Sequence, residues 1–172
     1  MGLAFQVGHA SEVFINGFDK NVEKELVSRF GKSIDMKCAQ DHYYSQELAW
    51  EGWKMLQNAV QRKITQKNAA HLLSMEAWQG CYVPAKTEPL EVAILGEETP
   101  LAVASLPALV QELESFGRAS KLPVDDSGLE ELAARYDDDD LVDSDMDIQT
   151  YAALLMAAHE AMRRRQVLWV VK

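Results

Sequence analysis

Seven aspartates crowd into residues 137–147, and carboxylate side chains at this density are the most specialised chemistry in the chain. They are Asp137, Asp138, Asp139, Asp140, Asp143, Asp145 and Asp147. Carboxylate oxygens are ligands for Ca²⁺ and Mg²⁺, and a dense run of them also attracts a basic protein surface. The run therefore predicts a divalent-metal loop, a partner-binding surface or a solvated acidic loop.

An EF-hand loop does not fit this run. Counting from Asp143 places acids at the first, third and fifth positions, but Ile148 stands where the loop needs glycine. Leu154 stands where it needs a bidentate glutamate. A weak site of oxygen ligands remains as an alternative.

The end of the run has a structural explanation. Ser144, Asp145 and Asp147 stand before an apolar-periodic helix, where side-chain acceptors cap free N–H groups and acids suit the helix dipole. Asp137 to Asp140 have no such role and repel one another. We expect these four to form an exposed loop and to be the first contact of any basic partner.

Cysteine and histidine offer a second candidate site. Cys38 and His42 would share a face of a helix, and with His71 and Cys81 they could form a Cys₂His₂ zinc site or a Cys–His nucleophile pair. The spacing matches no compact zinc finger, so buried, unreactive cysteine is preferred. His159 lies on an apolar helical face, which favours a hydrogen-bonded core histidine over a catalytic one.

Periodicity and turn residues predict the elements that position these side chains. Strands are expected at 3–7, 12–15, 81–84, 90–95 and 166–171, and helices at 19–30, 46–64, 68–78, 106–116, 129–136 and 148–165. Ser105 is the expected N-cap of one helix, and Gly52 marks a close contact or a kink in another. The strand at 166–171 is apolar on both faces, which predicts an interior strand. The order predicts one α+β domain over residues 1–172, a small mixed sheet packed by four to six helices.

Charge and the absence of known motifs disfavour several classes of function. The formal net charge is -10, and residues 91–172 hold seventeen acids against seven bases. Such a surface disfavours nucleic acid and anionic membranes. With no basic leader, no apolar run of about 20 residues and two cysteines, a cytoplasmic location with reduced thiols is expected. The glycine-rich motifs of hydrolases and nucleotide-binding proteins are missing, so no cofactor is expected.

Several short landmarks follow one another in a recognisable order. They are Met1-Gly2, Leu48-Ala49-Trp50, Pro89-Leu90, Ile94-Leu95-Gly96, Leu106-Pro107 with Val110, Arg135-Tyr136-Asp137 and the final helix–strand pair. Together they resemble the YfbM-like family of bacterial proteins of unknown function. Two features depart from that family: Glu51 and Lys54 replace an expected histidine, and no Tyr-Pro step precedes the last helix. The resemblance implies a small α+β domain and transfers no catalytic residue.

These observations favour a non-catalytic, protein-binding domain with an immunity-like or antitoxin-like role, because acidic proteins of that kind neutralise basic partners by charge complementarity. A small enzyme using Cys38, His42, His71 or Cys81 is one alternative. Weak divalent-metal binding by residues 137–147 is another.

Overall fold

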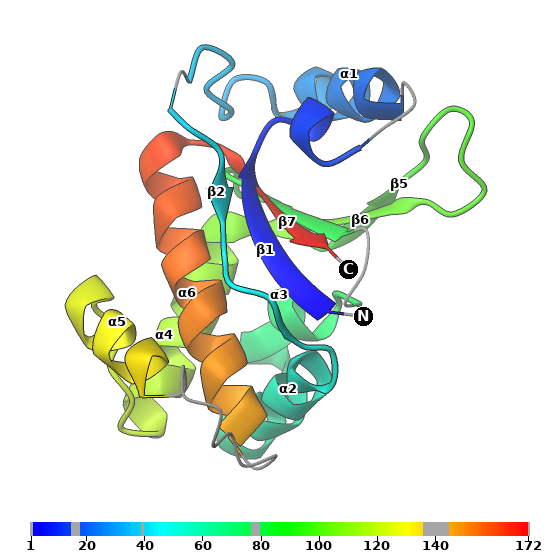
Figure 1. Cartoon of the computed structure of the whole chain (residues 1–172). Coiled ribbons are helices and arrows are strands. Elements are labelled where there is room, and N and C mark those ends of the chain that lie inside the picture. The colour runs from blue at the N-terminus through cyan, green and yellow to red at the C-terminus, as the bar shows by residue number, and fades with distance from the viewer. Residues whose placement is uncertain (1, 15–17, 39, 77–79, 136–144, 172) are drawn as a thin grey trace.

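The computed structural model describes residues 2–14, 18–38, 40–76, 80–135 and 145–171, and a mixed β-sheet lies at its centre (Figure 1). Its strands are β1 Gly2–Gly8, β2 Tyr43–Tyr44, β3 Leu48–Ala49, β4 Gly80–Val83, β5 Leu90–Val92, β6 Leu101–Ser105 and β7 Val167–Val171. Within the described residues the order is β2-β1-β7-β4-β6-β5, and β3 also pairs with β1. β4 and β6 run parallel, and the other pairs are antiparallel. The predicted α+β class is confirmed.

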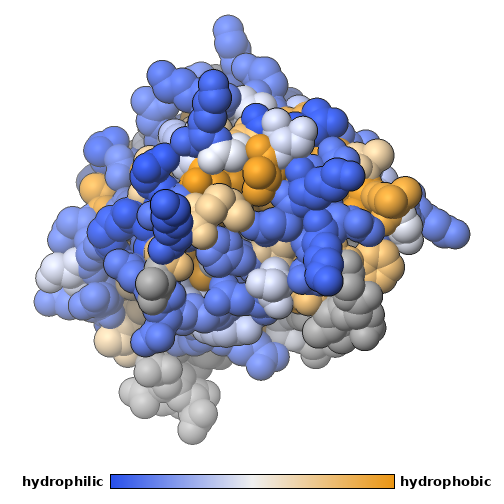
Figure 2. All heavy atoms as spheres, turned by 90° about the horizontal axis from the view of Figure 1, so that it is seen from above, coloured by the Kyte–Doolittle hydropathy of each residue, from blue (hydrophilic) through white to orange (hydrophobic). Residues whose placement is uncertain are grey.

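Helices cover the two faces of this sheet unequally. They are α1 Phe18–Phe30, α2 Glu51–Lys63, α3 Ala70–Leu73, α4 Leu106–Ala119, α5 Asp126–Ala134 and α6 Met146–Arg164, with short 3₁₀ turns at Ala10–Glu12 and Gln66–Ala69. α1 lies over one face, whereas α2, α3, α4 and α6 lie on the other, and α5 packs outside α6 (Figure 1). Seen from the α1 side, the surface is mostly hydrophilic with small apolar patches (Figure 2).

Strand alternation builds one hydrophobic core on each face. Leu3 and Phe5 point toward the face with most helices, whereas Cys81 and Trp169 point toward α1. β7 lies between β1 and β4 and is buried on both faces, which confirms the interior strand. Among the described residues, no helix combines the length and apolarity needed to cross a membrane.

Gly52 lets α2 approach α6 closely. A methyl group at this position would overlap Oγ1 of Thr150 and lie 3.0 Å from the backbone oxygen of Met146. The close contact expected at Gly52 is therefore present, and it fixes α2 against the central helix of the larger core.

Several boundaries differ from the sequence predictions. The strand expected at 12–15 is wrong for residues 12–14, and residue 15 lies outside the described residues. Ala10–Glu12 forms a 3₁₀ turn instead, in which the Glu12 side chain accepts the N–H of His9 at 3.0 Å. The helix expected at 46–64 begins only at Glu51, since Leu48–Ala49 pairs with β1 instead.

Some secondary-structure predictions for the middle of the chain are also wrong. Within the described residues, the helix expected at 68–78 is reduced to Ala70–Leu73 after a 3₁₀ turn, and Gly80 opens β4. β6 was missed, although Ser105 caps α4 as predicted by accepting the N–H of Ala108 at 3.3 Å. α5 begins earlier than expected because Asp125 caps it.

Candidate functional site

The residues proposed for a zinc or nucleophile site are spread over the fold. Cys81 is fully buried on the α1 side of the sheet, and this burial raises the pKa of its thiol. The neighbouring Tyr82 points to the opposite face, where its hydroxyl donates to the backbone oxygen of His71 at 3.1 Å. Successive strand residues point to opposite faces, so Cys81 and His71 lie on different sides of the sheet.

His71 has a structural role. Its Nδ1 atom accepts the backbone N–H of Ser105 at 3.0 Å, so the neutral ring carries its proton on Nε2. Burial lowers the pKa of His71, and the charge of Glu88 offsets part of that effect. His71 therefore joins α3 to the end of β6.

His42 and Cys38 lie in the segment between α1 and β3. Nδ1 of His42 is 2.7 Å from Oε2 of Glu12, and its Nε2 is buried without a hydrogen-bond partner. Cys38 is half-buried, and its N–H bonds to the oxygen of Asp35 at 3.4 Å. Among the described residues, no three or more His, Cys, Asp or Glu side chains are arranged to hold a metal ion. The Cys₂His₂ alternative is therefore not formed.

Most of the aspartate run lies outside the described residues, including Asp137 to Asp140 and Asp143. Asp147, in the first turn of α6, accepts the N–H of Ile148 at 2.8 Å. Asp145 occupies the N-cap position without a side-chain cap bond. The capping prediction is thus wrong for Asp145, whereas Asp147 accepts an N–H of the first turn from within the helix. Ser144 lies outside the described residues.

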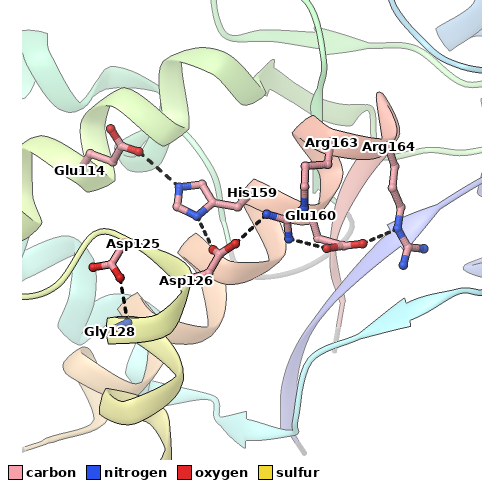
Figure 3. Close-up of polar contacts among 8 residues, drawn as sticks. All are labelled: Glu114, Asp125, Asp126, Gly128, His159, Glu160, Arg163 and Arg164. Atoms are coloured by element: carbon pink, nitrogen blue, oxygen red, sulfur yellow. Dashed lines mark hydrogen bonds and ion pairs between the residues drawn. The ribbon is translucent and has the colours of Figure 1, made fainter.

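Three helices meet in a charged network around His159 (Figure 3). Nδ1 of His159 is 2.8 Å from Oδ1 of Asp126 in α5, and Nε2 is 3.3 Å from Oε1 of Glu114 in α4. The other oxygen of Asp126 accepts from Arg163 at 2.6 Å, and Arg163 also donates to Glu160 at 2.5 Å. The predicted hydrogen bonding of His159 is confirmed, but the ring is half-buried in a charged network and is not part of the core. Both of its nitrogens face carboxylates.

Arginine keeps these carboxylates ionised. Burial alone would raise the pKa of Asp126, but hydrogen bonds from His159 and Arg163 lower it below its ordinary value. The hydrogen bond from Arg163 is the main cause of the lowered pKa of Glu160, and Arg164 assists at 2.7 Å. Both His159 nitrogens thus lie against carboxylates of the protein itself. The network therefore joins α4 and α5 to α6.

α5, which this network holds, presents an acidic side to solvent. Leu129 and Leu132 are buried, whereas Glu130 and Glu131 are exposed. In the sequence, α5 leads almost directly into Asp137 to Asp140.

A pocket of about 740 Å³ lies beside the network, at the carboxyl ends of β4 and β6. Two of its polar residues, Ser105 and Glu114, are hydrogen-bonded within the protein: the Ser105 hydroxyl accepts from Ala108, and the Ser105 N–H donates to His71. Glu114, also in its wall, bonds to His159 and to Arg118. The wall also contains Lys86, Glu88 and Gln111.

Sequence reasoning singled out His159 but missed Asp126 and Glu114. The spacing of His159, Glu160 and Arg163 on one helix could have suggested a charged cluster, because side chains three and four apart are neighbours. The two carboxylate partners are 33 and 45 residues away, and no local pattern connects them to His159.

In comparisons with known proteins, no protein-family model, curated protein or solved structure matches this chain.

Proposed function

We propose that this chain is a non-catalytic protein-binding domain with an immunity-like or antitoxin-like role, which binds a basic partner in the cytoplasm. The proposed binding residues, called the acidic face below, are Glu130 and Glu131 on α5 together with Asp137 to Asp140, which follow α5 in the sequence. The observation that most supports this proposal is the orientation of α5. Its two leucines are buried, whereas Glu130 and Glu131 are exposed to solvent. A relationship to the YfbM-like bacterial family is part of this proposal and rests on the order of the sequence landmarks.

The distribution of charge along the chain supports a partner with a basic surface. The net charge of -10 arises in the second half of the chain, which includes α5 and the aspartate run. Complementary charge speeds encounter and selects partners more than it adds affinity. Exposed ion pairs contribute about 0.2–1 kcal/mol each, so the acidic face steers the partner and apolar contacts add the remaining affinity.

The histidine and cysteine contacts also favour binding over catalysis. His159 uses both nitrogens for carboxylates, His71 accepts a backbone N–H, and the Cys81 thiol is buried. The enzyme alternative therefore depends on Cys38 and His42, and no hydrogen bond or ion pair joins these two residues in the described part of the chain. The rate at which the Cys38 thiol is alkylated separates the two proposals.

A titration followed by NMR tests the proposed surface, with a lysine-rich peptide as the probe. We expect shifts of α5 amides and of residues 137–140 at low salt. They should fade at high salt, because the Debye length falls from about 10 Å at 0.1 M to about 3 Å at 1 M. A glutamate-rich peptide of equal length is the control. Shifts centred elsewhere, or shifts insensitive to salt, contradict the proposal.

A further inference from the structure

A groove of about 570 Å³ lies along α1, between this helix, the first 3₁₀ turn and the segment that follows α1. Three exposed side chains of α1 line it: Lys20, Lys24 and Val27. Residues three and four apart are neighbours on a helix, so these three form one face. Val22 and Leu26, on the opposite face, are buried in the core between α1 and the sheet. The groove therefore takes the side of α1 that the core leaves free.

Lys20 and Lys24 bring positive charge to this groove. The acid between them, Glu23, is engaged elsewhere: it accepts the N–H of Ala10 at 3.3 Å and lies 3.6 Å from Nδ1 of His9. Among the described residues, neither lysine side chain forms a hydrogen bond or an ion pair. Both ammonium groups are therefore available to carboxylates of a partner.

The apolar part of the groove consists of Val27 and Met36, which are 38% and 42% exposed. Met36 is held in place by the preceding residue, Asp35, whose N–H bonds to the backbone oxygen of Arg165 at 2.8 Å. The backbone oxygen of Asp35 in turn accepts from the side chain of Gln166. Exposed apolar side chains beside charged ones are typical of interaction sites, and methionine adapts its shape to a partner.

We propose that this groove, called the α1 groove below, binds an acidic peptide segment of another protein. Carboxylates of the segment pair with Lys20 and Lys24, and an aliphatic side chain of the segment packs on Val27 and Met36. The α1 groove is a second binding surface, on a different helix from the acidic face, and it does not depend on the proposed function.

The distribution of charge favours a short peptide over a membrane or a nucleic acid. Residues 18–38 hold five bases and four acids, whereas the whole chain has a net charge of -10. An extended polyanion meets the repulsion of the whole chain, but a short segment contacts only the region around α1. One acid, Asp19, also lines the groove, and it lies in the first turn of α1, where the positive end of the helix dipole offsets its charge.

An NMR titration of the whole chain tests the α1 groove, with a glutamate-rich peptide that contains a single leucine as the probe. We expect shifts of α1 amides and of residues 36–37 at low salt, which fade at high salt because the attraction is screened. Replacing the leucine of the peptide by serine should weaken binding by about fivefold, since the apolar contact with the groove is lost.

Two pairs of charge reversals separate the groove from the net charge. Lys20→Glu with Lys24→Glu should weaken binding by at least about threefold, because two exposed attractions become repulsions. Lys54→Glu with Lys63→Glu changes the net charge equally, but these exposed lysines are on α2, across the sheet from α1 (Figure 1). This control pair should have a much smaller effect.

The proposal is overturned if both pairs weaken binding equally, or if the peptide shifts amides outside the α1 groove. It is also overturned if vesicles of anionic lipid, or a single-stranded oligonucleotide, shift the same amides more strongly than the peptide does. Shifts of these amides with the concentration of the free chain alone would make the occupant a second copy, and they too would overturn it.

Discussion

Oδ1 of Asp126 lies 2.8 Å from Nδ1 of His159, and this contact ties the first turn of α5 to the C-terminal half of α6. α5 has only nine residues, and its buried positions are Leu129 and Leu132. Isolated helices of this length are unstable in water, so α5 depends on its contacts with neighbouring helices. The presentation of the acidic face therefore depends on the His159 network.

Arg163→Gln should make the protein unfold at a higher pH on acidification. Arg163 lowers the pKa of Glu160 and, with His159, that of Asp126. Acids with lowered native pKa values stabilise the protein above their unfolded values of about 4, and this contribution is lost as pH falls through the lowered pKa. Without Arg163 the loss occurs at a higher pH, which circular dichroism during acid titration measures.

The matched control is Arg29→Gln, because Arg29 pairs with exposed Glu25 at the longer distance of 3.9 Å. It should leave the acid transition unchanged. Equal shifts for the two variants would show that the network does not hold its carboxylates ionised. The shift for Arg163→Gln should be modest, since the Asp126 side chain is 42% exposed and solvent screens it.

Glu112→Gln should destabilise the protein by about 1–3 kcal/mol, the cost of leaving a buried backbone donor without a partner. The two oxygens of Glu112 accept the N–H groups of His71 at 2.9 Å and Leu72 at 2.8 Å. Glutamine offers one acceptor oxygen and directs N–H toward N–H at the other. Urea unfolding measures the difference, and exposed Glu130→Gln should change stability by less than about 0.5 kcal/mol. Equal effects would exclude this role for Glu112.

Gly52→Ala should also destabilise, although alanine favours a helix over glycine by about 1 kcal/mol. The added methyl overlaps Oγ1 of Thr150, and overpacking of this kind costs about 1–3 kcal/mol. Combining it with Thr150→Ala should recover part of the loss, because the overlapping oxygen is gone. A double-mutant cycle from thermal unfolding measures this coupling. Additive effects would mean that α2 and α6 are not in close contact here.

The two thiols should differ in reactivity. Cys81 is fully buried and burial raises its pKa, so alkylation should require unfolding. Half-buried Cys38 should react in the native state at no more than the rate of a model thiol at pH 7, as expected of a protein that does not use it for catalysis. Mass spectrometry after timed alkylation measures both rates. A Cys38 rate far above that of the model thiol would favour the enzyme alternative.

The sequence correctly predicted the helices and strands that are determined by residues close together in the chain. Apolar periodicity located α1, α4 and α6, and the doubly apolar strand β7 was placed correctly in the sheet interior. Ser105 was recognised as a cap because its partner Ala108 is three residues away. Strand β3 at Leu48–Ala49 was read as helix, since its conformation comes from pairing with Gly2 and Leu3, far away in the chain.

The candidate site was predictable only in part, for the same reason. His159 could be placed on an apolar helical face, but the identity of its acids is set by how α4 and α5 dock on α6. Likewise, Cys81 and His71 are ten residues apart in sequence, and alternation in β4 puts the sheet between them. Such contacts come from tertiary packing, which no local pattern records.

A pair of charge reversals tests the acidic face most directly. Glu130→Lys with Glu131→Lys alters α5, whereas Glu97→Lys with Glu98→Lys alters exposed residues of the β5–β6 hairpin at the opposite end of the molecule (Figure 1). Both pairs change the net charge equally, so only the position of the charge differs.

The measurement is the dissociation constant of the lysine-rich peptide at low salt. The α5 pair should weaken binding by at least about threefold, because it removes two exposed attractions of about 0.2–1 kcal/mol each and adds repulsion. The hairpin pair should have a much smaller effect. Equal weakening by both pairs, or greater weakening by the hairpin pair, would contradict a binding surface on α5.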